Sequence, residues 1–261
     1  MNHDAHHPSP RLLPLGDAAW TIEFGTSIDP ALHGRVMGLA EQLRHARTAG
    51  NNPLLASIVD VVPTFRSLTV HYDPLQGTGE TLGKQLLELA EKAGQAAASG
   101  RRWQLPVCFD ADLAPDLDAL AASKGLSRET VIERLTGTTF HVYMIGFMPG
   151  FPYMGGLPDE LNTPRLASPR KAVPARSLAI AGEMCAVYPW ESPGGWHLLG
   201  RTPISLFDTV DRDNPALLAS GDEVRWLAVD RNTYQAQEAA LASRTLARDS
   251  FLLAPEAAWT A

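Results

Sequence analysis

The sequence predicts an α+β protein with a small α+β domain over residues 1–98 and a β-rich domain over residues 99–261. The first hundred residues combine alternating apolar positions with two stretches at helical spacing. Glycine and proline supply 17 of the 58 residues from Gly146 to Pro203, against 41 of 261 in the whole chain, and this density excludes long helices there. Residues 94–101, GQAAASGR, are the predicted linker.

The first domain is expected to be ferredoxin-like or a related α+β fold. Apolar residues alternate from Leu13 to Phe24 on either side of a Gly16-Asp17 turn, which predicts a hairpin with one buried face. Asp29-Pro30 predicts the start of a helix, with apolar residues at helical spacing up to Leu43.

The rest of this domain is expected to repeat the pattern. Asn51-Asn52-Pro53 ends the first helix, and a strand follows over 55–62 until Pro63 breaks it. A second strand is predicted at 68–72 and a second helix at 82–93. Two helices on one face of a small antiparallel sheet is the economical arrangement.

The second domain is expected to be a β-barrel or sandwich of short strands and many turns. The elements predicted outside its glycine- and proline-rich stretch are strands at 103–107, 140–147 and 224–229 and helices at 115–124, 127–136 and 235–248.

Composition excludes several classes of function. The formal net charge is -7, so phosphate-backbone binding to nucleic acid is disfavoured. No run of 18 apolar residues predicts a membrane span, and the first ten residues lack the features of a signal peptide, so a cytoplasmic location is expected. Cys108 and Cys185 lie far apart without CxxC spacing, so neither a disulfide framework nor a metal site is predicted.

A cluster of cations is the first candidate site. Between Asn162 and Gly182 the chain carries four cations and no acid, namely Arg165, Arg170, Lys171 and Arg176. On an acidic protein, a local charge of +4 in a proline-rich frame points to an anionic ligand or an acidic partner surface. The alternative is a solvated basic loop.

Two flanking segments extend this candidate site. Gly146–Gly156, GFMPGFPYMGG, is able to present backbone N–H groups to an anion, with Phe147, Phe151 and Tyr153 as pocket walls or as packing at a tight corner. His197 and Arg201 lie beside the glycine turn of Ser192–Pro203, where an imidazole is suited to proton transfer. A purely structural role for His197 stays open.

The motifs of residues 146–208 are similar to those of one family. They read GFMPGFPYMGGLP, then TPRLASPRKAVPARS, AIAG, VYP and SPGGWHLLGRTP. In this pattern the chain resembles the family that contains the B subunit of 5-oxoprolinase, allophanate hydrolase subunit 1 and the sporulation kinase inhibitor. One position departs from it: Arg176 stands where the family usually has glycine, so either the turn differs or Arg176 adds a charge to the pocket.

The resemblance implies a cyclophilin-like β-barrel in the second domain. It also implies that the chain is the B subunit of an ATP-dependent 5-oxoprolinase, active only with the C and A subunits as partners, which opens 5-oxo-L-proline to L-glutamate. ATP, with Mg²⁺, is expected to be bound by the complex. Within that chemistry His197 is the predicted proton-transfer residue, and the predicted substrate- or phosphate-binding residues are Tyr153, Arg165, Arg170, Lys171 and Arg201.

Three alternatives remain at this point. One is a component of allophanate hydrolase or urea amidolyase, although the PGFPYMGG form is closer to 5-oxoprolinases. Another is an inhibitor of a sensor histidine kinase, which needs a protein-binding surface and no catalytic residue. A peptidyl-prolyl isomerase is suggested by the expected barrel alone and ranks last.

Overall fold

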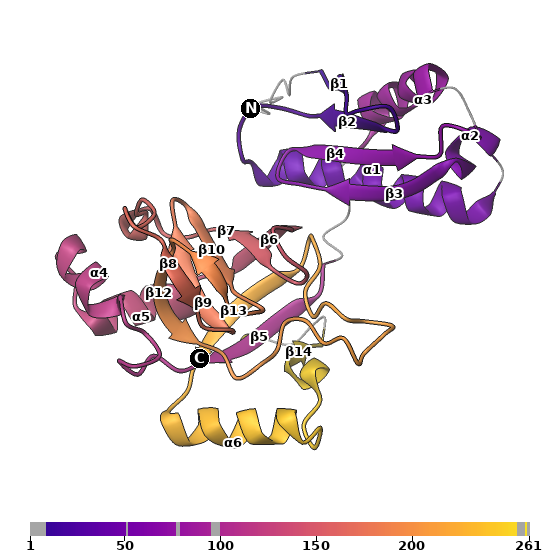
Figure 1. The fold of residues 1–261 in the computed structure, drawn as a ribbon. Coiled ribbons are helices and arrows are strands. Elements are labelled where there is room, and N and C mark those ends of the chain that lie inside the picture. Colours follow the sequence, from indigo (N-terminus) through magenta and orange to yellow (C-terminus); the bar gives the residue numbers. More distant parts are fainter. Residues whose placement is uncertain (1–8, 51, 77–78, 95–99, 255–258, 260–261) are drawn as a thin grey trace. The chain divides into compact units, whose positions relative to one another are not determined.

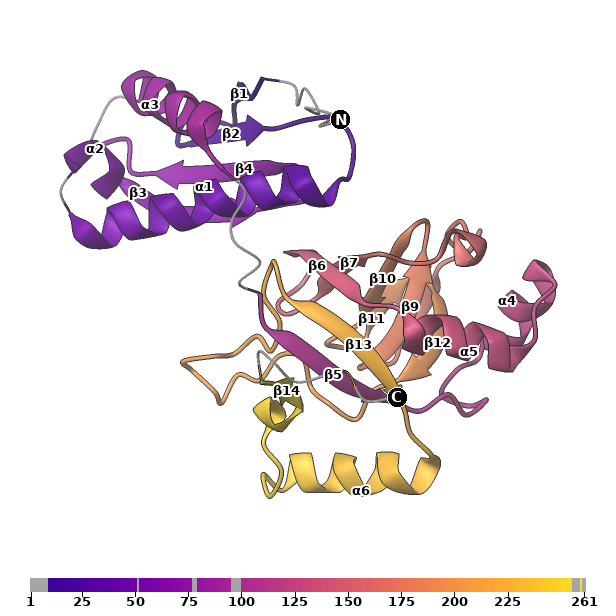
Figure 2. The same ribbon diagram turned by 180° about the vertical axis from the view of Figure 1, so that it is seen from behind.

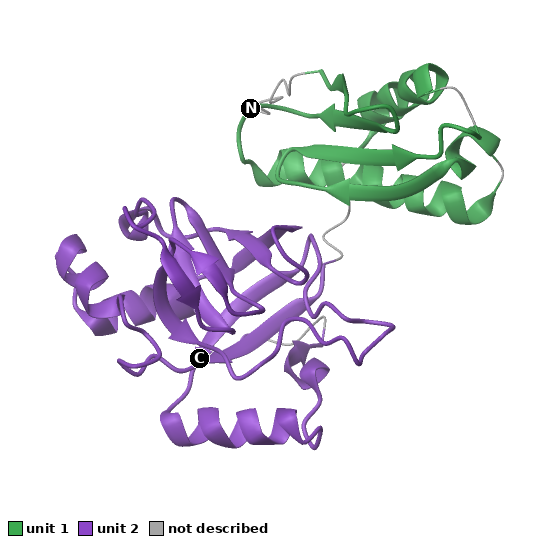
Figure 3. Ribbon diagram, viewed as in Figure 1, with its two compact units in different colours: residues 1–99 green, residues 100–261 purple. Residues whose placement is uncertain are grey.

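The computed structural model describes residues 9–50, 52–76, 79–94, 100–254 and 259. The chain divides into two units, Met1–Ser99 and Gly100–Ala261 (Figure 3). The predicted boundary between residues 98 and 99, and residues 95–99 of the predicted linker, lie outside the described residues. Both units mix helices with sheets, so the α+β class is confirmed.

Unit 1 contains an antiparallel sheet with the strand order β1-β2-β4-β3. Its strands are β1 (Arg11–Pro14), β2 (Ala19–Glu23), β3 (Ile58–Pro63) and β4 (Ser67–Tyr72), and its helices are α1 (Pro30–Ala49), α2 (Pro53–Ala56) and α3 (Gly79–Lys92). The strands β2 and β3 flank β4, so β2–α1–β3 is a split βαβ unit. The order along the chain differs from the βαββαβ order of a ferredoxin-like domain, because the outer strand beside β2 comes first.

The core of unit 1 lies between the sheet and the two long helices. Figure 2 shows α1 in front of the sheet, and Figure 1 shows it behind. Leu39 of α1, Leu86 of α3 and Val70 of β4 are fully buried in the same cluster. The predicted start of α1 is confirmed: the Asp29 carboxylate accepts hydrogen bonds from the backbone N–H groups of Ala31 (2.7 Å) and Leu32 (3.1 Å).

One predicted boundary in unit 1 is wrong. The strand expected over 55–62 begins only at Ile58, because residues 53–56 form the helical turn α2. The Asn52 side chain accepts hydrogen bonds from the N–H groups of Leu54 (3.0 Å) and Leu55 (3.4 Å), and Pro53 occupies the first helical position. Asn52-Pro53 therefore starts a helical turn after α1 has ended.

Unit 2 is built around a sheet with the strand order β12-β9-β10-β7-β6-β13-β5-β14. Its strands are β5 (Arg102–Val107), β6 (Phe140–Ile145), β7 (Pro152–Gly155), β9 (Ser177–Ala181), β10 (Met184–Val187), β12 (His197–Arg201), β13 (Glu223–Ala228) and β14 (Leu252–Leu253). A separate two-stranded ribbon pairs β8 (Arg170–Val173) with β11 (Ser192–Gly194). The helical elements are α4 (Leu117–Lys124), α5 (Arg128–Gly137), α6 (Arg231–Ala242) and the short η1 (Asp159–Leu161) and η2 (Arg248–Phe251).

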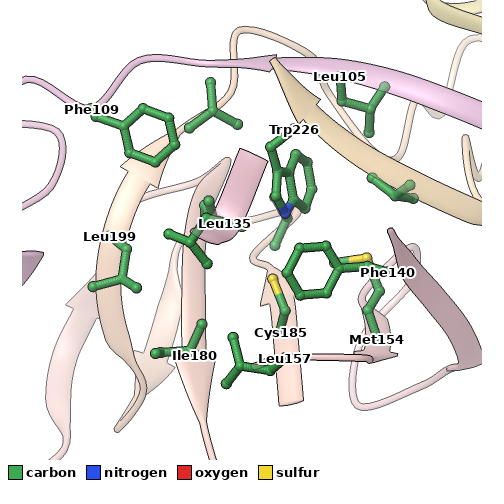
Figure 4. Close-up of a cluster of buried hydrophobic side chains, with 14 of the residues drawn as sticks. Leu105, Phe109, Leu135, Phe140, Met154, Leu157, Ile180, Cys185, Leu199 and Trp226 are labelled. Carbon is green, nitrogen blue, oxygen red and sulfur yellow. The ribbon is translucent and has the colours of Figure 1, made fainter. Parts of the chain in front are cut away.

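The large sheet curls around the main core of unit 2. Figure 4 shows Trp226, Phe140 and Cys185 in this core, together with Leu135 of α5. The curl brings β12 back toward β5 at one point, where the backbones of Cys108 and Arg201 exchange two hydrogen bonds (2.9 and 3.0 Å).

The expectation of a barrel is corrected by this sheet. A single bridge pair joins the two sides of the curl, and β14 pairs with β5 at the edge of the sheet. The described strands therefore form a curled sheet that is not a closed barrel. A closed barrel needs continuous ladders around its whole circumference, which a pattern of short strands does not specify.

The last helix is also shifted from its predicted position at 235–248. It starts at Arg231, because the Asp230 carboxylate accepts a hydrogen bond from the N–H of Thr233 (2.7 Å). It ends at Ala242, and Arg244 then adopts a left-handed backbone conformation with φ of 59°. No helix in the described ranges is both long and apolar enough to cross a membrane.

Candidate functional site

An aromatic cluster lies on the side of the large sheet opposite its main core. Phe151, which is 2% exposed, stands at its centre. Its ring centroid is 4.9 Å from Tyr153, 5.2 Å from Tyr188 and 6.0 Å from Trp196. The alternation along β9 and β10 explains the second core, because Ile180 and Cys185 face the main core while Ala179 and Ala186 face this cluster.

The glycine- and proline-rich segment of 146–156 therefore forms an aromatic-packed corner. Phe151 is buried in it, whereas Phe147 is 66% exposed. Of the three side chains expected as pocket walls, Phe151 fills a core and Phe147 faces solvent, so neither lines a pocket. Only Tyr153 is left half-buried at the edge of the cluster.

Two of the predicted site residues, Tyr153 and Arg165, lie beside the Trp196 ring. The Tyr153 ring is 6.0 Å from the Trp196 ring, and the Arg165 guanidinium carbon lies 6.0 Å from the same ring. Burial raises the pKa of the Tyr153 hydroxyl, and the nearby Arg165 charge partly opposes that shift. The His197 Nε2 atom is 3.0 Å from the carbonyl oxygen of Pro164, the residue before Arg165. His197 pairs with Ile180, which faces the main core, so its side chain lies on the other face of β12 from Trp196. We call Tyr153, Arg165 and Trp196, together with the adjacent His197, the Trp196 cluster.

The hydrogen bond at His197 determines which of the two ring nitrogens carries the proton. A carbonyl oxygen only accepts, so in this contact Nε2 carries the proton. In the neutral ring Nδ1 then holds the free lone pair, and it is the atom able to accept a proton.

Arg170 has a different environment from Arg165. Its Nη2 atom lies 2.5 Å from Oδ1 of Asp116, and its Nη1 atom lies 3.5 Å from the carbonyl oxygen of Trp196. The other Asp116 oxygen accepts the backbone N–H of Leu198 at 2.7 Å. Asp116 and Arg170 thus hold β12 on both sides of His197. Sequence reasoning missed Asp116, which carries no motif, since its role depends on contacts 54 and 82 residues away.

Lys171 and Arg201 lie outside the Trp196 cluster. Lys171 is exposed on β8. Arg201 is at the opposite end of β12 from His197, four residues or about 13 Å along an extended strand. Among the residues that the structure describes, its buried Nε atom has no hydrogen-bond partner. Its charge helps to lower the pKa of Asp112 and opposes the rise that burial causes in the pKa of Tyr234. The structure therefore places Tyr153 and Arg165 beside Trp196, His197 at the carbonyl of the residue before Arg165, and Arg201 elsewhere.

Arg176, at the position where the motif resemblance leads us to expect glycine, has a left-handed backbone conformation. Its φ is 67°. Its Nη1 atom donates to the carbonyl oxygen of Pro203 (3.0 Å), and its Nη2 atom pairs with Glu238 of α6 (2.5 Å). The extra charge is therefore bound to α6 and is not added to the Trp196 cluster.

A cavity of about 1020 Å³ lies in unit 2 beside α6, away from the Trp196 cluster. Its walls include Trp190 and four arginines that are each paired with an acid, namely Arg101 with Asp222, Arg176 with Glu238, Arg244 with Asp208 and Arg248 with Asp211. Among the described residues, no group of three or more His, Cys, Asp or Glu side chains is placed to hold a metal ion.

Comparisons with known proteins cover most of the chain. Residues 10–218 match the family described as carboxyltransferase domain, subdomain C and D. The chain is 35% identical over 236 residues to the B subunit of 5-oxoprolinase from Bacillus subtilis, covering 85% of this chain and 94% of that relative.

Solved structures with the same fold include longer chains. TTHA0988 is 34% identical with a TM-score of 0.69, covering 81% of this chain, but this chain spans only 40% of TTHA0988. The urea carboxylase of Kluyveromyces lactis has a TM-score of 0.68 at 20% identity, covering 87% of this chain and 22% of the enzyme, and this likeness shows the fold alone.

Proposed function

We propose a function from the family to which this chain belongs: it is a member of the family of 5-oxoprolinase B subunits, within the wider family of carboxyltransferase subdomains C and D. The chain acts as the B subunit of an ATP-dependent 5-oxoprolinase that opens 5-oxo-L-proline to L-glutamate. The observation that carries this proposal is the identity of 35% over 94% of a relative that bears this name. The urea carboxylase likeness is weaker, at 20% identity.

We further propose that the curled, open sheet of unit 2 belongs to a cyclophilin-like fold, and that the partners are the C and A subunits of 5-oxoprolinase. The complex works in the cytoplasm, where ATP is available. ATP, with Mg²⁺, is bound by the complex, and no metal ligand is proposed within this chain.

The reaction needs activation because a five-membered lactam is a poor electrophile. Transfer of the γ-phosphoryl group of ATP to the lactam oxygen releases ADP and makes the ring carbon electrophilic. Water then attacks this carbon, the C–N bond opens, and a second water releases phosphate to leave L-glutamate. Arginine and backbone N–H donors stabilise the negative charge that develops on the oxygens.

Within this chain, the Trp196 cluster is the proposed contribution to that site. Arg165 provides an exposed cation for the carboxylate or phosphate, held over the Trp196 ring. Tyr153, whose hydroxyl stays protonated because burial raises its pKa, donates a hydrogen bond to substrate. His197 accepts a proton at Nδ1. Lys171 is a second exposed cation, whereas Arg170 positions β12 through Asp116.

The test is ATP-dependent release of glutamate from 5-oxo-L-proline by this chain with its co-encoded partner proteins, each omitted in turn. Glutamate formation that stops when this chain is left out supports the proposal, and no turnover by the complete set contradicts it. Allophanate replaces 5-oxo-L-proline in a parallel assay, where turnover identifies the urea amidolyase alternative.

Single substitutions then test the cluster. Arg165→Gln, Tyr153→Phe and His197→Gln are expected to lower turnover at least tenfold. Arg134→Gln is the matched control, because Arg134 is an exposed arginine of α5 that is paired with Glu160 and lies outside the Trp196 cluster. Equal activity in all four variants removes the Trp196 cluster from the reaction.

A further inference from the structure

The carboxylate of Asp116 stands at the start of a helix but does not cap it. Asp116 occupies the N-cap position of α4, where an aspartate side chain usually accepts a hydrogen bond from an N–H group of the first turn. Within the described residues of α4, no such hydrogen bond forms. The side chain, which is 14% exposed, is instead directed to β12, and Figure 1 shows this strand beside α4. The carboxylate is therefore committed to contacts outside its own helix.

Both oxygens of the Asp116 carboxylate are used in these contacts. Oδ2 accepts the backbone N–H of Leu198 at 2.7 Å, and Oδ1 lies 2.5 Å from Nη2 of Arg170. The backbone N–H of Asp116 also donates to the carbonyl oxygen of Leu198 at 3.1 Å. One residue thus binds both backbone polar groups of Leu198 in β12 and the first side chain of β8.

The position of β12 in the sheet makes these contacts important. β12 is the last strand in the sheet order, so β9 pairs with one edge of it, and the register of this pairing shifts between Leu198 and Gly200. In the described structure, the other edge of β12 is bonded to Asp116 at Leu198 and to Cys108 at Arg201. The first half of the strand, which begins at residue 197, is therefore held on this edge by Asp116.

The contacts of Asp116 lie next to both segments that form the Trp196 cluster. Trp196 and His197 immediately precede the leucine that Asp116 binds. Arg165 lies five residues before Arg170, the cation that pairs with Asp116. A single carboxylate thus connects the segment that carries Arg165 with the segment that carries the tryptophan and the histidine.

We propose that Asp116 is a positioning residue of the Trp196 cluster, an inference that rests on the function proposed above. Asp116 acts through β12 and β8 and needs no contact with the substrate. Groups that are held in place before the reaction stabilise developing charge without the cost of reorganisation, so a loosened β12 lowers the rate even in a folded chain.

The experiment measures kcat and KM for ATP-dependent glutamate release by the complete set of co-encoded proteins. Asp116→Ala removes the acceptor for the Leu198 N–H and the charge beside Arg170, and it is expected to lower kcat at least about tenfold. Asp116→Asn keeps an oxygen for the Leu198 N–H, so it is expected to retain most of kcat. Its KM for 5-oxo-L-proline should rise, because the segment that carries Arg165 loses its ion pair with Asp116. Asp118→Ala is the matched control and leaves both constants unchanged, since Asp118 lies in the first turn of the same helix and pairs with Arg128.

Hydrogen exchange separates positioning from a loss of overall stability. The amide of Leu198 is bonded to Asp116, so peptides covering residues 196–200 should exchange faster in Asp116→Ala than in the control at a temperature where both chains are folded. Exchange in the main core of unit 2, at residues 224–228 of β13, should stay unchanged.

The outcomes distinguish this inference from the proposed function. Turnover by the unmodified set together with an unchanged kcat in Asp116→Ala overturns the positioning role and leaves the proposed function standing. Equal loss of kcat in the alanine and asparagine variants, in proportion to a loss of folded chain, also overturns it, because Asp116 then acts on stability alone. Unchanged exchange at residues 196–200 in Asp116→Ala contradicts the hold on β12 whatever the activity. No turnover by the complete unmodified set refutes the proposed function, and the positioning role in that reaction fails with it.

Discussion

Replacing Arg176 tests whether the left-handed turn or the side-chain contacts matter more at this position. Arg176→Ala removes the contacts with Pro203 and Glu238 but keeps a Cβ atom at a φ of 67°. Arg176→Gly removes the same contacts and also relieves the backbone. The difference between the two variants therefore isolates the conformational cost.

The magnitudes follow from the geometry. A left-handed backbone destabilises an L-residue such as alanine by about 1–2 kcal/mol, and glycine avoids this cost. Glycine loses more conformational entropy on folding than alanine does, which offsets about 0.5–1 kcal/mol of that advantage. The glycine variant should thus be more stable than the alanine variant by about 0.5–1 kcal/mol, the reverse of the usual order. The hydrogen bond to Pro203 contributes about 1 kcal/mol. The ion pair, whose side chains are 26% and 37% exposed, contributes less than about 1 kcal/mol.

Urea unfolding followed by tryptophan fluorescence measures this difference. Five of the six tryptophans lie in unit 2, so the signal reports mainly on the unit that contains Arg176. Glu238→Gln, which removes the ion pair and leaves the turn intact, is the control and should cost less than about 1 kcal/mol. The reasoning is refuted if the alanine variant is as stable as the glycine variant or more stable.

Three further predictions concern other parts of the chain. Arg170→Gln should lower the free energy of unfolding, measured in urea, by about 1–3 kcal/mol, because it leaves the Asp116 carboxylate without its cation. Lys171→Ala should change it by less than about 0.5 kcal/mol, and equal effects of the two substitutions would contradict the positioning role of Arg170. Burial lowers the pKa of His141, so below about pH 6.5 the unfolded chain binds more protons than the folded chain and the melting temperature should fall from pH 7.5 to 5.5. The fall should be smaller in His141→Gln, and parallel curves of melting temperature against pH for the two proteins would disprove this. Cys108 and Cys185 should resist a thiol reagent in the native chain and react in urea, because burial raises the pKa of both thiols; rapid native labelling of either would refute the buried placement.

Local sequence signals predicted the local structure well. Asp29-Pro30 begins α1 where the capping rules place it, because a cap is formed by neighbours within three residues. The same rules, applied to Asn52-Pro53, predict the short helix α2 that the strand assignment over 55–62 missed. The strand begins later than predicted because the Asn52 cap starts a helical turn before the run of β-branched residues that begins at Ile58.

The sequence predicted the candidate site only in part. Residues 146–208 were identified from their motifs, and Tyr153 and Arg165 do lie beside one tryptophan, whereas His197 contacts the residue before Arg165. The sequence did not predict that Arg170 and Arg165 have different environments, since both are cations of one basic segment. What distinguishes them is Asp116, which the fold brings to Arg170 from 54 residues earlier.

The sequence alone determined the α+β class, the family membership and the caps of individual helices, because composition, fixed motifs and contacts within a few residues carry that information. Tertiary structure decided which cation is committed to an ion pair, how far the sheet closes and which aromatic ring remains in solvent. Phe147 and Phe151 are the same residue type four positions apart, yet one is exposed and the other is buried. Their difference depends on packing against β-strands distant in the chain, and no local pattern specifies such contacts.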